Sequence, residues 1–251
     1  MWQLYDALID GIDPDRKVDR AVHGQWRACV SSGGSAGLSS IIRPYEAVSI
    51  KAESIDGLKG TSLRDAAALV KSWDFKDAAI GLAALNAFYN SADSLPPERS
   101  EIYSLGTEDG DIFEHLLPEI GGKNVGVIGH FRGLRELYRD KCKLYIFERD
   151  PRPGDYPDPA EEYLLPEMDL VIITGMTLTN KTLPRILQLS SGAKVVLTGP
   201  SATFAPVLSR FGVDILSGML VDNADACIDS VLNSADSMDF FRYARKAIVS
   251  L

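Results

Sequence analysis

The chain has 251 residues, of which 45% are hydrophobic and 24% are charged. This composition is that of an ordinary globular protein and excludes a disordered, collagen-like or fibrous chain. The 26 Lys and Arg residues face 35 Asp and Glu residues, so the net charge is -9. A negative balance disfavours nucleic acid and anionic membrane surfaces as partners.

The cysteines and the amino terminus favour a protein of the cytoplasm. Cys29, Cys142 and Cys227 lie far apart and none belongs to a CxxC pair, so neither a disulfide framework nor a thiolate zinc site is expected. The first residues lack the basic and apolar regions of a signal peptide, and the later apolar runs are about as long as strands. We therefore expect no export and no membrane span.

The first ninety residues combine a short helix, a hairpin and two further helices. A helix is expected over about 4–9, and alternating stretches at 18–23 and 26–31, with a turn at Gly33-Gly34, predict antiparallel strands. Ser62 and Asp74 each precede an aspartate by three residues, a spacing typical of helix N-caps. An α+β domain is therefore predicted for residues 1–95.

The helix predicted over 75–90 carries an amide on its apolar face. Asn86 falls within about 20° of Phe75 when residues are placed about 100° apart around a helix. A buried amide has to be hydrogen-bonded, so Asn86 either pins the packing or reaches into a site between the domains. Asn90 lies one turn later near the same edge of the helix, so the same two roles are expected for it.

A segment with linker composition at 91–100 leads into a repeated pattern of strand and helix. Strands are expected at 124–128, 143–147, 169–174, 194–198 and 213–217. Strands that are apolar on both faces suit a parallel sheet covered by helices on each side. Right-handed crossovers make such a sheet doubly wound. The predicted fold is α/β, with the second domain over 96–251.

Candidate binding residues lie where these strands end, because open parallel sheets bind ligands at the carboxyl ends of their strands. Four of the five expected ends contain glycine, the last one being Gly218-Met219. Glycine lets a ligand approach the backbone, but tight turns need it as well. The candidates for binding a ligand or cofactor are Gly129, Phe131, Arg149, Asp150, Thr174, Gly175, Asn180, Thr182, Gly199, Pro200 and Ser201, together with Asn86 and Asn90.

His130 and Glu148 are the candidate catalytic residues. His130 follows the first strand of the second half, where an imidazole can serve as acid, base or ligand, although a lone histidine is more often structural. Glu148 stands 19 residues beyond Gly129, where an acid would hold ribose hydroxyls, or is simply a solvated acid. The turn at Gly129 does not spell G-x-G-x-x-G, so the dinucleotide fingerprint is missing.

Two loops flank the expected crevice. Prolines at 151, 153, 157 and 159 stiffen the loop after Glu148, which forms either a wall of the site or a surface connector. Thr179 or Asn180 can cap the helix that runs to Leu189, and the surplus hydroxyl and amide groups of 177–182 indicate ligand hydrogen bonds. No metal-binding motif is present in the sequence, so the metal ligands are unknown.

Several blocks together resemble the family named "putative heavy-metal chelation", a domain family of unknown function. They are 81–90 (GLAALNAFYN), 125–131 (VGVIGHF), 148–155 (ERDPRPGD), 169–175 (DLVIITG) with 180–184 (NKTLP), and 199–201 (GPS). The resemblance covers nearly the whole chain. It implies an enolase N-terminal-like domain, a Rossmann-like domain and an active site in the cleft between them. The implied role is heavy-metal chelation, or the making or handling of metal-chelating cofactors such as cobalamin precursors or siderophores.

The first expectation is therefore an interdomain cleft that binds a small polar metabolite. The cofactor is unknown; a divalent transition metal, free or held in a small-molecule chelate, is the one implied. The alternative is a Rossmann-type enzyme that uses a nucleotide in the same crevice, with His130 as acid or base. The third hypothesis is a scaffold or subunit role, in which the same motifs serve only as turns and helix caps. A small molecule is the expected partner, and both a homodimer and enzymatic activity are left open.

Overall fold

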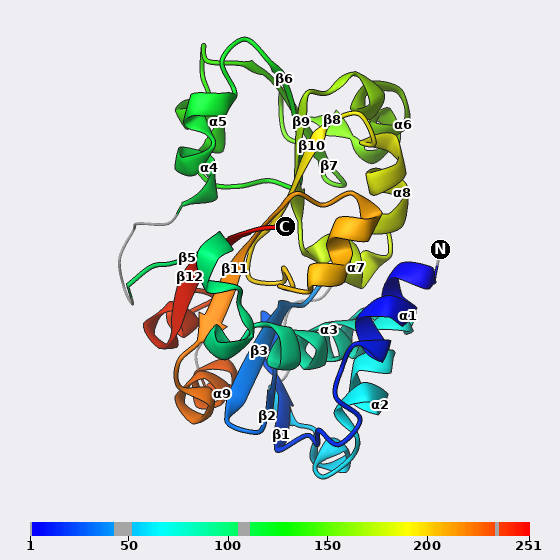
Figure 1. Cartoon of the computed structure of the whole chain (residues 1–251), viewed down its shortest axis with the longest axis vertical. Helices are drawn as coiled ribbons and strands as arrows, with labels where there is room; N and C mark the ends of the chain where they lie inside the picture. Colours follow the sequence, from blue (N-terminus) through cyan, green and yellow to red (C-terminus); the bar gives the residue numbers. More distant parts are fainter. Residues whose placement is uncertain (1, 43–51, 105–110, 234–235) are drawn as a thin grey trace.

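Two β-sheets frame the protein and follow one another along its longest axis (Figure 1). The structure is a computed structural model that describes residues 2–42, 52–104, 111–233 and 236–251. A four-stranded antiparallel sheet belongs to the N-terminal half, and an eight-stranded mixed sheet belongs to the C-terminal half. The expected α/β class, an α+β part followed by a doubly wound sheet, is confirmed.

The N-terminal sheet has the strand order β3-β2-β1-β4. The predicted strands are present, and Gly33 and Gly34 turn the chain between two of them with φ angles of 56° and 83°. The elements of this half are α1 (Gln3–Asp10), β1 (Arg20–His23), β2 (Arg27–Ser32), β3 (Ser35–Ser40), β4 (Glu53–Ser54), α2 (Leu63–Ala68) and α3 (Phe75–Tyr89).

Helix α3 packs across one face of this sheet and is buried on nearly every side. Asp74 begins the helix as predicted, because its carboxylate accepts hydrogen bonds from the backbone N–H groups of Lys76 (2.8 Å) and Asp77 (3.2 Å). Ser62 also stands at the predicted N-cap position, that of α2. The capping hydrogen bond expected of its side chain is wrong, because the side chain makes none.

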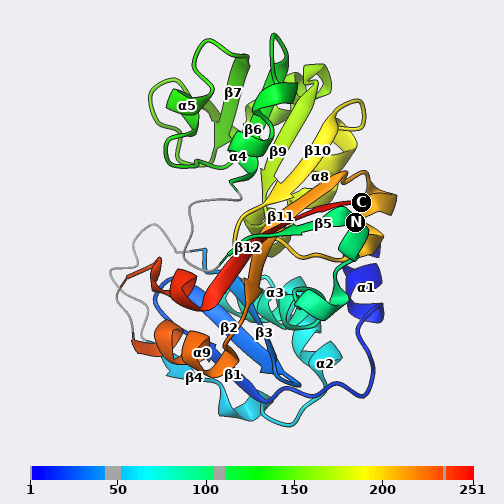
Figure 2. The same ribbon diagram turned by 60° about the vertical axis from the view of Figure 1, so that its left-hand side comes forward.

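The opposite face of the N-terminal sheet is covered by the far end of the chain. Helix α9 (Ala224–Asn233) packs on β1 and β2, as Figure 2 shows. Along β2, Ala28 and Val30 join the core that includes α3, whereas Cys29 joins a cluster with Cys227 and Ile228 of α9. The alternation of side chains along a strand explains this division.

The C-terminal sheet has the order β5-β12-β11-β10-β9-β6-β7-β8. Its parallel part, from β8 to β11, has the Rossmann order 3-2-1-4-5-6 when strands are counted from β6. The strands are β5 (Ser100–Ile102), β6 (Asn124–Ile128), β7 (Lys143–Glu148), β8 (Tyr156–Pro157), β9 (Leu170–Thr174), β10 (Lys194–Thr198), β11 (Ile215–Val221) and β12 (Ala244–Ser250). The connecting helices are α4 (Ile112–His115), α5 (Leu134–Leu137), α6 (Glu161–Leu164), α7 (Met176–Asn180) and α8 (Leu183–Leu189).

The five strands predicted for this half are present, with one correction. Strand β11 continues to Val221, so Gly218 and Met219 lie inside the strand and not at its end. The reason is the antiparallel partner β12, which pairs along the whole of β11 and places Ala244 opposite Val221. Neither β12 nor β5 was predicted from the sequence.

The two halves share an apolar core. Leu82 of α3, Leu178 of α7 and Leu216 of β11 belong to one buried cluster. The hydroxyl of Tyr5 donates to the carbonyl of Leu178 at 3.0 Å. The domain boundary at residues 95 and 96 stays a prediction. Within the described ranges, no helix has both the length and the apolar character needed to cross a membrane.

Asn90, just after α3, joins the two halves through one buried amide. Its Nδ2 donates to the carbonyls of Ala202 (2.9 Å) and Met219 (3.3 Å), and its Oδ1 accepts from the N–H of Phe204 (2.9 Å). Only 3% of the residue is exposed. The amide therefore satisfies backbone groups that water cannot reach.

Replacing Asn90 by alanine should lower the free energy of unfolding by about 2–4 kcal/mol, because each buried group left unpaired costs about 1–3 kcal/mol. Urea unfolding followed by circular dichroism measures the change. Asn233→Ala, at the exposed end of α9, is the matched control and should change stability by less than about 0.5 kcal/mol. Equal effects of the two substitutions would contradict the role of Asn90.

Candidate functional site

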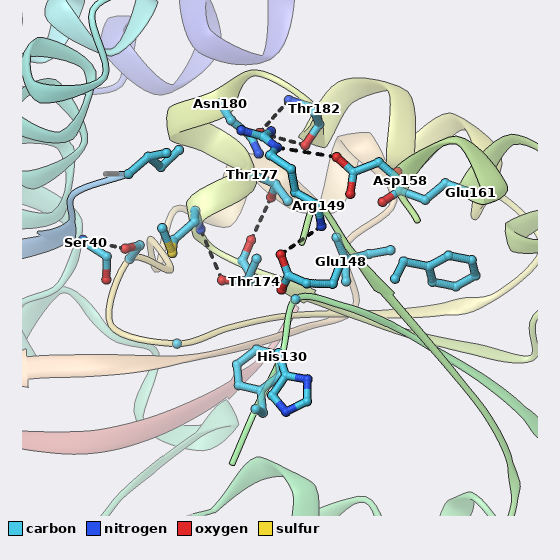
Figure 3. A pocket seen from close by; sticks show the side chains of 18 of the residues that line it. Ser40, His130, Glu148, Arg149, Asp158, Glu161, Thr174, Thr177, Asn180 and Thr182 are labelled. Carbon is cyan, nitrogen blue, oxygen red and sulfur yellow. Dashed lines mark hydrogen bonds and ion pairs between the residues drawn. The ribbon is translucent and has the colours of Figure 1, made fainter. Parts of the chain in front are cut away.

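A pocket of about 410 Å³ opens at the carboxyl ends of the parallel strands. The ends of β6, β7, β9 and β10 contribute to its lining, and the N-terminal half contributes Ser40, the last residue of β3, and Ile42. Figure 3 shows the polar side chains that gather there. The pocket thus lies where the crevice rule places a ligand, at the point where β6 has β7 on one side and β9 on the other.

Most of the candidate residues lie in the lining of this pocket. Both candidate catalytic residues, His130 and Glu148, are among them. The binding candidates in the lining are Gly129, Phe131, Arg149, Thr174, Asn180, Thr182, Gly199, Pro200 and Ser201.

Four candidates lie outside the lining. Asn86 is fully buried and donates to the carbonyl of Leu38 on β3 at 2.7 Å, and Asn90 bonds to the backbone of the C-terminal half. Gly175 packs so tightly that a Cβ would lie 2.4 Å from the backbone nitrogen of Ala202. Asp150 is exposed beyond the pocket. For the two asparagines the structure favours the packing role over the ligand role.

Two glycines allow the strand ends to turn sharply beside the pocket. Gly129 follows β6 with a φ of +100°, and Gly199 follows β10 with a φ of +99°. Residues with side chains rarely adopt this conformation. The glycines therefore have a structural function, and they also leave the backbone open to the pocket.

The threonine and asparagine groups after β9 bond mostly to one another. The Thr177 hydroxyl donates to the carbonyl of Thr174 at 2.7 Å. Asn180 Oδ1 accepts from both the N–H (3.0 Å) and the hydroxyl (2.7 Å) of Thr182. These hydrogen bonds lie in the turn between α7 and α8. Asn180 therefore bonds to Thr182 within the turn and does not cap α8.

The N-terminal wall of the pocket was not predicted from the sequence. The backbone N–H of Ser40 donates to the hydroxyl of Ser201 at 2.8 Å, which joins the two halves at the pocket. The Ser40 hydroxyl accepts from Nη1 of Arg27 at 2.6 Å. Nothing in the spacing around Ser40 marks it, because its place depends on a contact 161 residues away.

Carboxylates outnumber cationic side chains in the described lining. Glu148, Asp158 and Glu161 share the lining with one guanidinium, that of Arg149. Arg149 Nε lies 3.5 Å from Asp158 Oδ2, and Glu148 accepts from the backbone N–H of Arg149 at 2.9 Å. Since Asp158 comes from the proline-rich loop, that loop contributes to the wall. The pocket therefore favours a positively charged occupant.

The environment of Glu161 raises the pKa of its carboxyl group. Burial, followed by the neighbouring carboxylates Asp158 and Glu162, raises the pKa of Glu161 to about 7, although Arg149 acts in the opposite direction. A carboxyl group with such a pKa carries a proton part of the time at neutral pH. A bound cation would oppose this shift, because a nearby positive charge favours the ionised carboxylate.

A bare metal ion does not fit the described residues. In those ranges no group of three or more His, Cys, Asp or Glu side chains is arranged to hold a metal. Contact with Cys227 and burial raise the pKa of Cys29, which lies in the core between β2 and α9, and burial raises the pKa of Cys142. Thiolate capture of a soft metal is therefore not supported.

Glu161→Gln should stabilise the protein at pH 8 by about 1–2 kcal/mol, a value reduced from the full shift because the side chain is partly exposed. Below the unfolded pKa of about 4.5 the carboxyl is protonated in both states, so the gain is absent. Between pH 4.5 and 7 the folded state retains a proton that the unfolded state releases, and wild-type stability falls as pH rises.

Urea unfolding of the wild-type protein and of Glu161→Gln, each at pH 4.5 and pH 8, tests this expectation. Glu162→Gln is the control, because Arg185 lowers the pKa of Glu162 and removing that carboxylate gives no gain at pH 8. A gain for Glu161→Gln that is the same at both pH values would show that the carboxyl is not perturbed.

Two solved structures share the fold of the whole chain. The chain is 37% identical to a protein of unknown function of the DUF364 family from Desulfitobacterium hafniense. The two structures superimpose over 100% of this chain and 99% of that one, with a TM-score of 0.88. A second DUF364 protein, from Pyrococcus horikoshii, is 22% identical and superimposes over 99% of this chain and 100% of its own with a TM-score of 0.78, which shows the same fold.

An uncharacterised protein of Methanocaldococcus jannaschii is 30% identical over 186 residues, which are 71% of this chain and 67% of that protein. Residues 5–89 match the family model DUF4213 and residues 111–250 match DUF364, both described as "putative heavy-metal chelation". The resemblance found in the sequence blocks is thereby confirmed, and the chain belongs to the DUF364 family.

Proposed function

We propose that the protein binds a small, polar, positively charged metabolite in this pocket, and that the positive charge is a metal ion held in a small-molecule chelate. The observation that carries the proposal is that three carboxylates, those of Glu148, Asp158 and Glu161, share the described lining with one guanidinium. A partly buried carboxylate near other carboxylates is stabilised by an opposite charge. Burial, followed by the neighbouring carboxylates, raises the pKa of Glu161 to about 7, and a cationic ligand would favour its ionised form.

A chelate suits the pocket better than a free ion does. The described residues offer no three-ligand metal cluster, so the small molecule would have to fill most of the coordination positions. The pocket would then supply shape, neutralising carboxylates and hydrogen bonds. The family description, "putative heavy-metal chelation", is compatible with this division.

Native mass spectrometry combined with elemental analysis, on protein purified gently from its own host, tests the proposal. The expected result is an organic mass with a stoichiometric metal, both released on denaturation. The double variant Glu148→Gln/Glu161→Gln should lose this mass, whereas the exposed Glu162→Gln should keep it. An empty pocket that also takes up no cationic chelate in solution would contradict the proposal.

A second candidate function is supported by the strand order and the position of Glu148. In Rossmann sheets an acid at the end of the second strand holds ribose hydroxyls, and Glu148 ends β7, the strand after β6. The turn after β6 lacks the glycine fingerprint, and α5 has only four residues, so a diphosphate has no helix terminus of the usual kind. The candidate is therefore a nucleoside without a diphosphate, such as the cationic S-adenosylmethionine.

Thermal unfolding with S-adenosylmethionine or NAD separates the two candidates. A ligand specific for the native state stabilises it by about 2.7 kcal/mol at a hundred times its Kd. Under the second candidate S-adenosylmethionine should raise the Tm, NAD should not, and Glu148→Gln should abolish the shift. Absence of a shift at millimolar concentration would remove the nucleoside candidate and leave the chelate proposal unaffected.

A further inference from the structure

His130 differs from the other pocket residues because a buried carboxylate faces its imidazole. The Asp155 side chain has no exposed surface, and its Oδ2 lies 3.4 Å from Nδ1 of His130. Its Oδ1 lies 2.5 Å from Nη2 of Arg135, and Oδ2 also accepts from the N–H of Arg152 at 3.0 Å. A buried, paired carboxylate therefore lies beside His130, which itself lines the pocket.

The contact between Asp155 and His130 determines which part of the ring remains available. Nδ1 is buried and makes no aligned hydrogen bond, although Asp155 is within ion-pair distance of it. A carboxylate on that side favours the tautomer with its proton on Nδ1, which leaves the lone pair on Nε2. The His130 side chain retains 23% of its surface and lines the pocket.

We propose that His130 is the protein's own ligand to the metal of the bound chelate, through Nε2, and that Asp155 is the residue that positions it. The inference rests on the proposed function. A carboxylate behind an imidazole is the usual way in which metal-binding histidines are oriented. A single imidazole suits an ion whose other positions the small molecule fills, and it agrees with the lack of a three-ligand cluster in the described ranges.

Neither of the other histidines can take this role. His23 is buried in the N-terminal half, where its Nε2 lies 2.9 Å from Glu53 Oε1. His115 ends α4 with an exposed side chain, outside the pocket. Because the sequence has three histidines, one substitution at His115 leaves His130 as the accessible imidazole.

The copper(II) complex of diethylenetriamine is a suitable probe, because it is a dication with one exchangeable equatorial position. The parent chain carries His115→Ala. Electron spin echo spectroscopy detects the remote ring nitrogen of an equatorially bound imidazole, and a titration gives the affinity. The parent should show the imidazole signal, and adding His130→Ala should abolish it and weaken binding at least about tenfold.

Asp155→Asn tests the positioning role, since it keeps an oxygen that can accept from Arg135. Loss of such a partner typically weakens metal binding about 10–100-fold, and the imidazole signal should persist at saturating probe. Nitrogen-15 NMR of the free protein should show the proton of His130 on Nδ1 in the parent and a mixture of tautomers in the variant. Unchanged nitrogen shifts, with an unchanged Tm, would overturn the role of Asp155.

The outcomes separate this inference from the proposed function. Probe binding that Glu148→Gln/Glu161→Gln weakens, but that shows no imidazole signal, overturns the assignment of His130 and leaves the proposed function standing. Loss of the signal in His130→Ala with carboxylate-dependent binding supports both. No binding by the parent chain contradicts both.

Discussion

The hydrogen bonds of one buried amide hold the two halves of the protein in a fixed relation. Asn90 bonds to Ala202 and Phe204 in the loop after β10, and to Met219 in β11. The same loop carries Ser201, which accepts from the backbone of Ser40 in the wall of the pocket. The position of that wall therefore depends on an interaction that lies outside the pocket. A buried amide with several backbone partners is well suited to this purpose, because it has one satisfactory orientation.

The proline-rich loop after β7 connects the two charged parts of the site. Its Asp155 faces His130 and Arg135, and its Asp158 pairs with Arg149 and lies near Glu161. Prolines restrict the loop before any ligand arrives, so the two aspartates are held without a large entropic cost on binding. The imidazole and the carboxylate cluster are thus presented together by a single stiff segment.

The parts of the site that could be predicted are those governed by local sequence. The strands of the parallel sheet are apolar on both faces, and the general rule for strand ends then leads to Gly129, Glu148, Thr174 and Gly199. The periodicity also places Asn86 on a packed face, but it cannot identify the partner, since α3 is buried nearly all round. Ser40, Asp155, Asp158 and Glu161 were not predicted as site residues, because their roles arise from contacts between distant segments or from burial that depends on the whole fold. The antiparallel strand β12 escaped prediction because its pairing with β11 is set by the sheet and not by a local pattern.

The cover that α9 provides for the N-terminal sheet bears on how the chain can fold during synthesis. Domains generally fold in order from the N-terminus as they leave the ribosome. Here Val22, Cys29 and Leu38 remain without their apolar partners until Ile228 and Val231 have been made. The N-terminal sheet can collapse onto α3 early, but its second face stays uncovered until α9 has been synthesised. Covering that face requires α9 to return to β1 and β2, and a fragment that stops before α9 would present an apolar sheet to its neighbours.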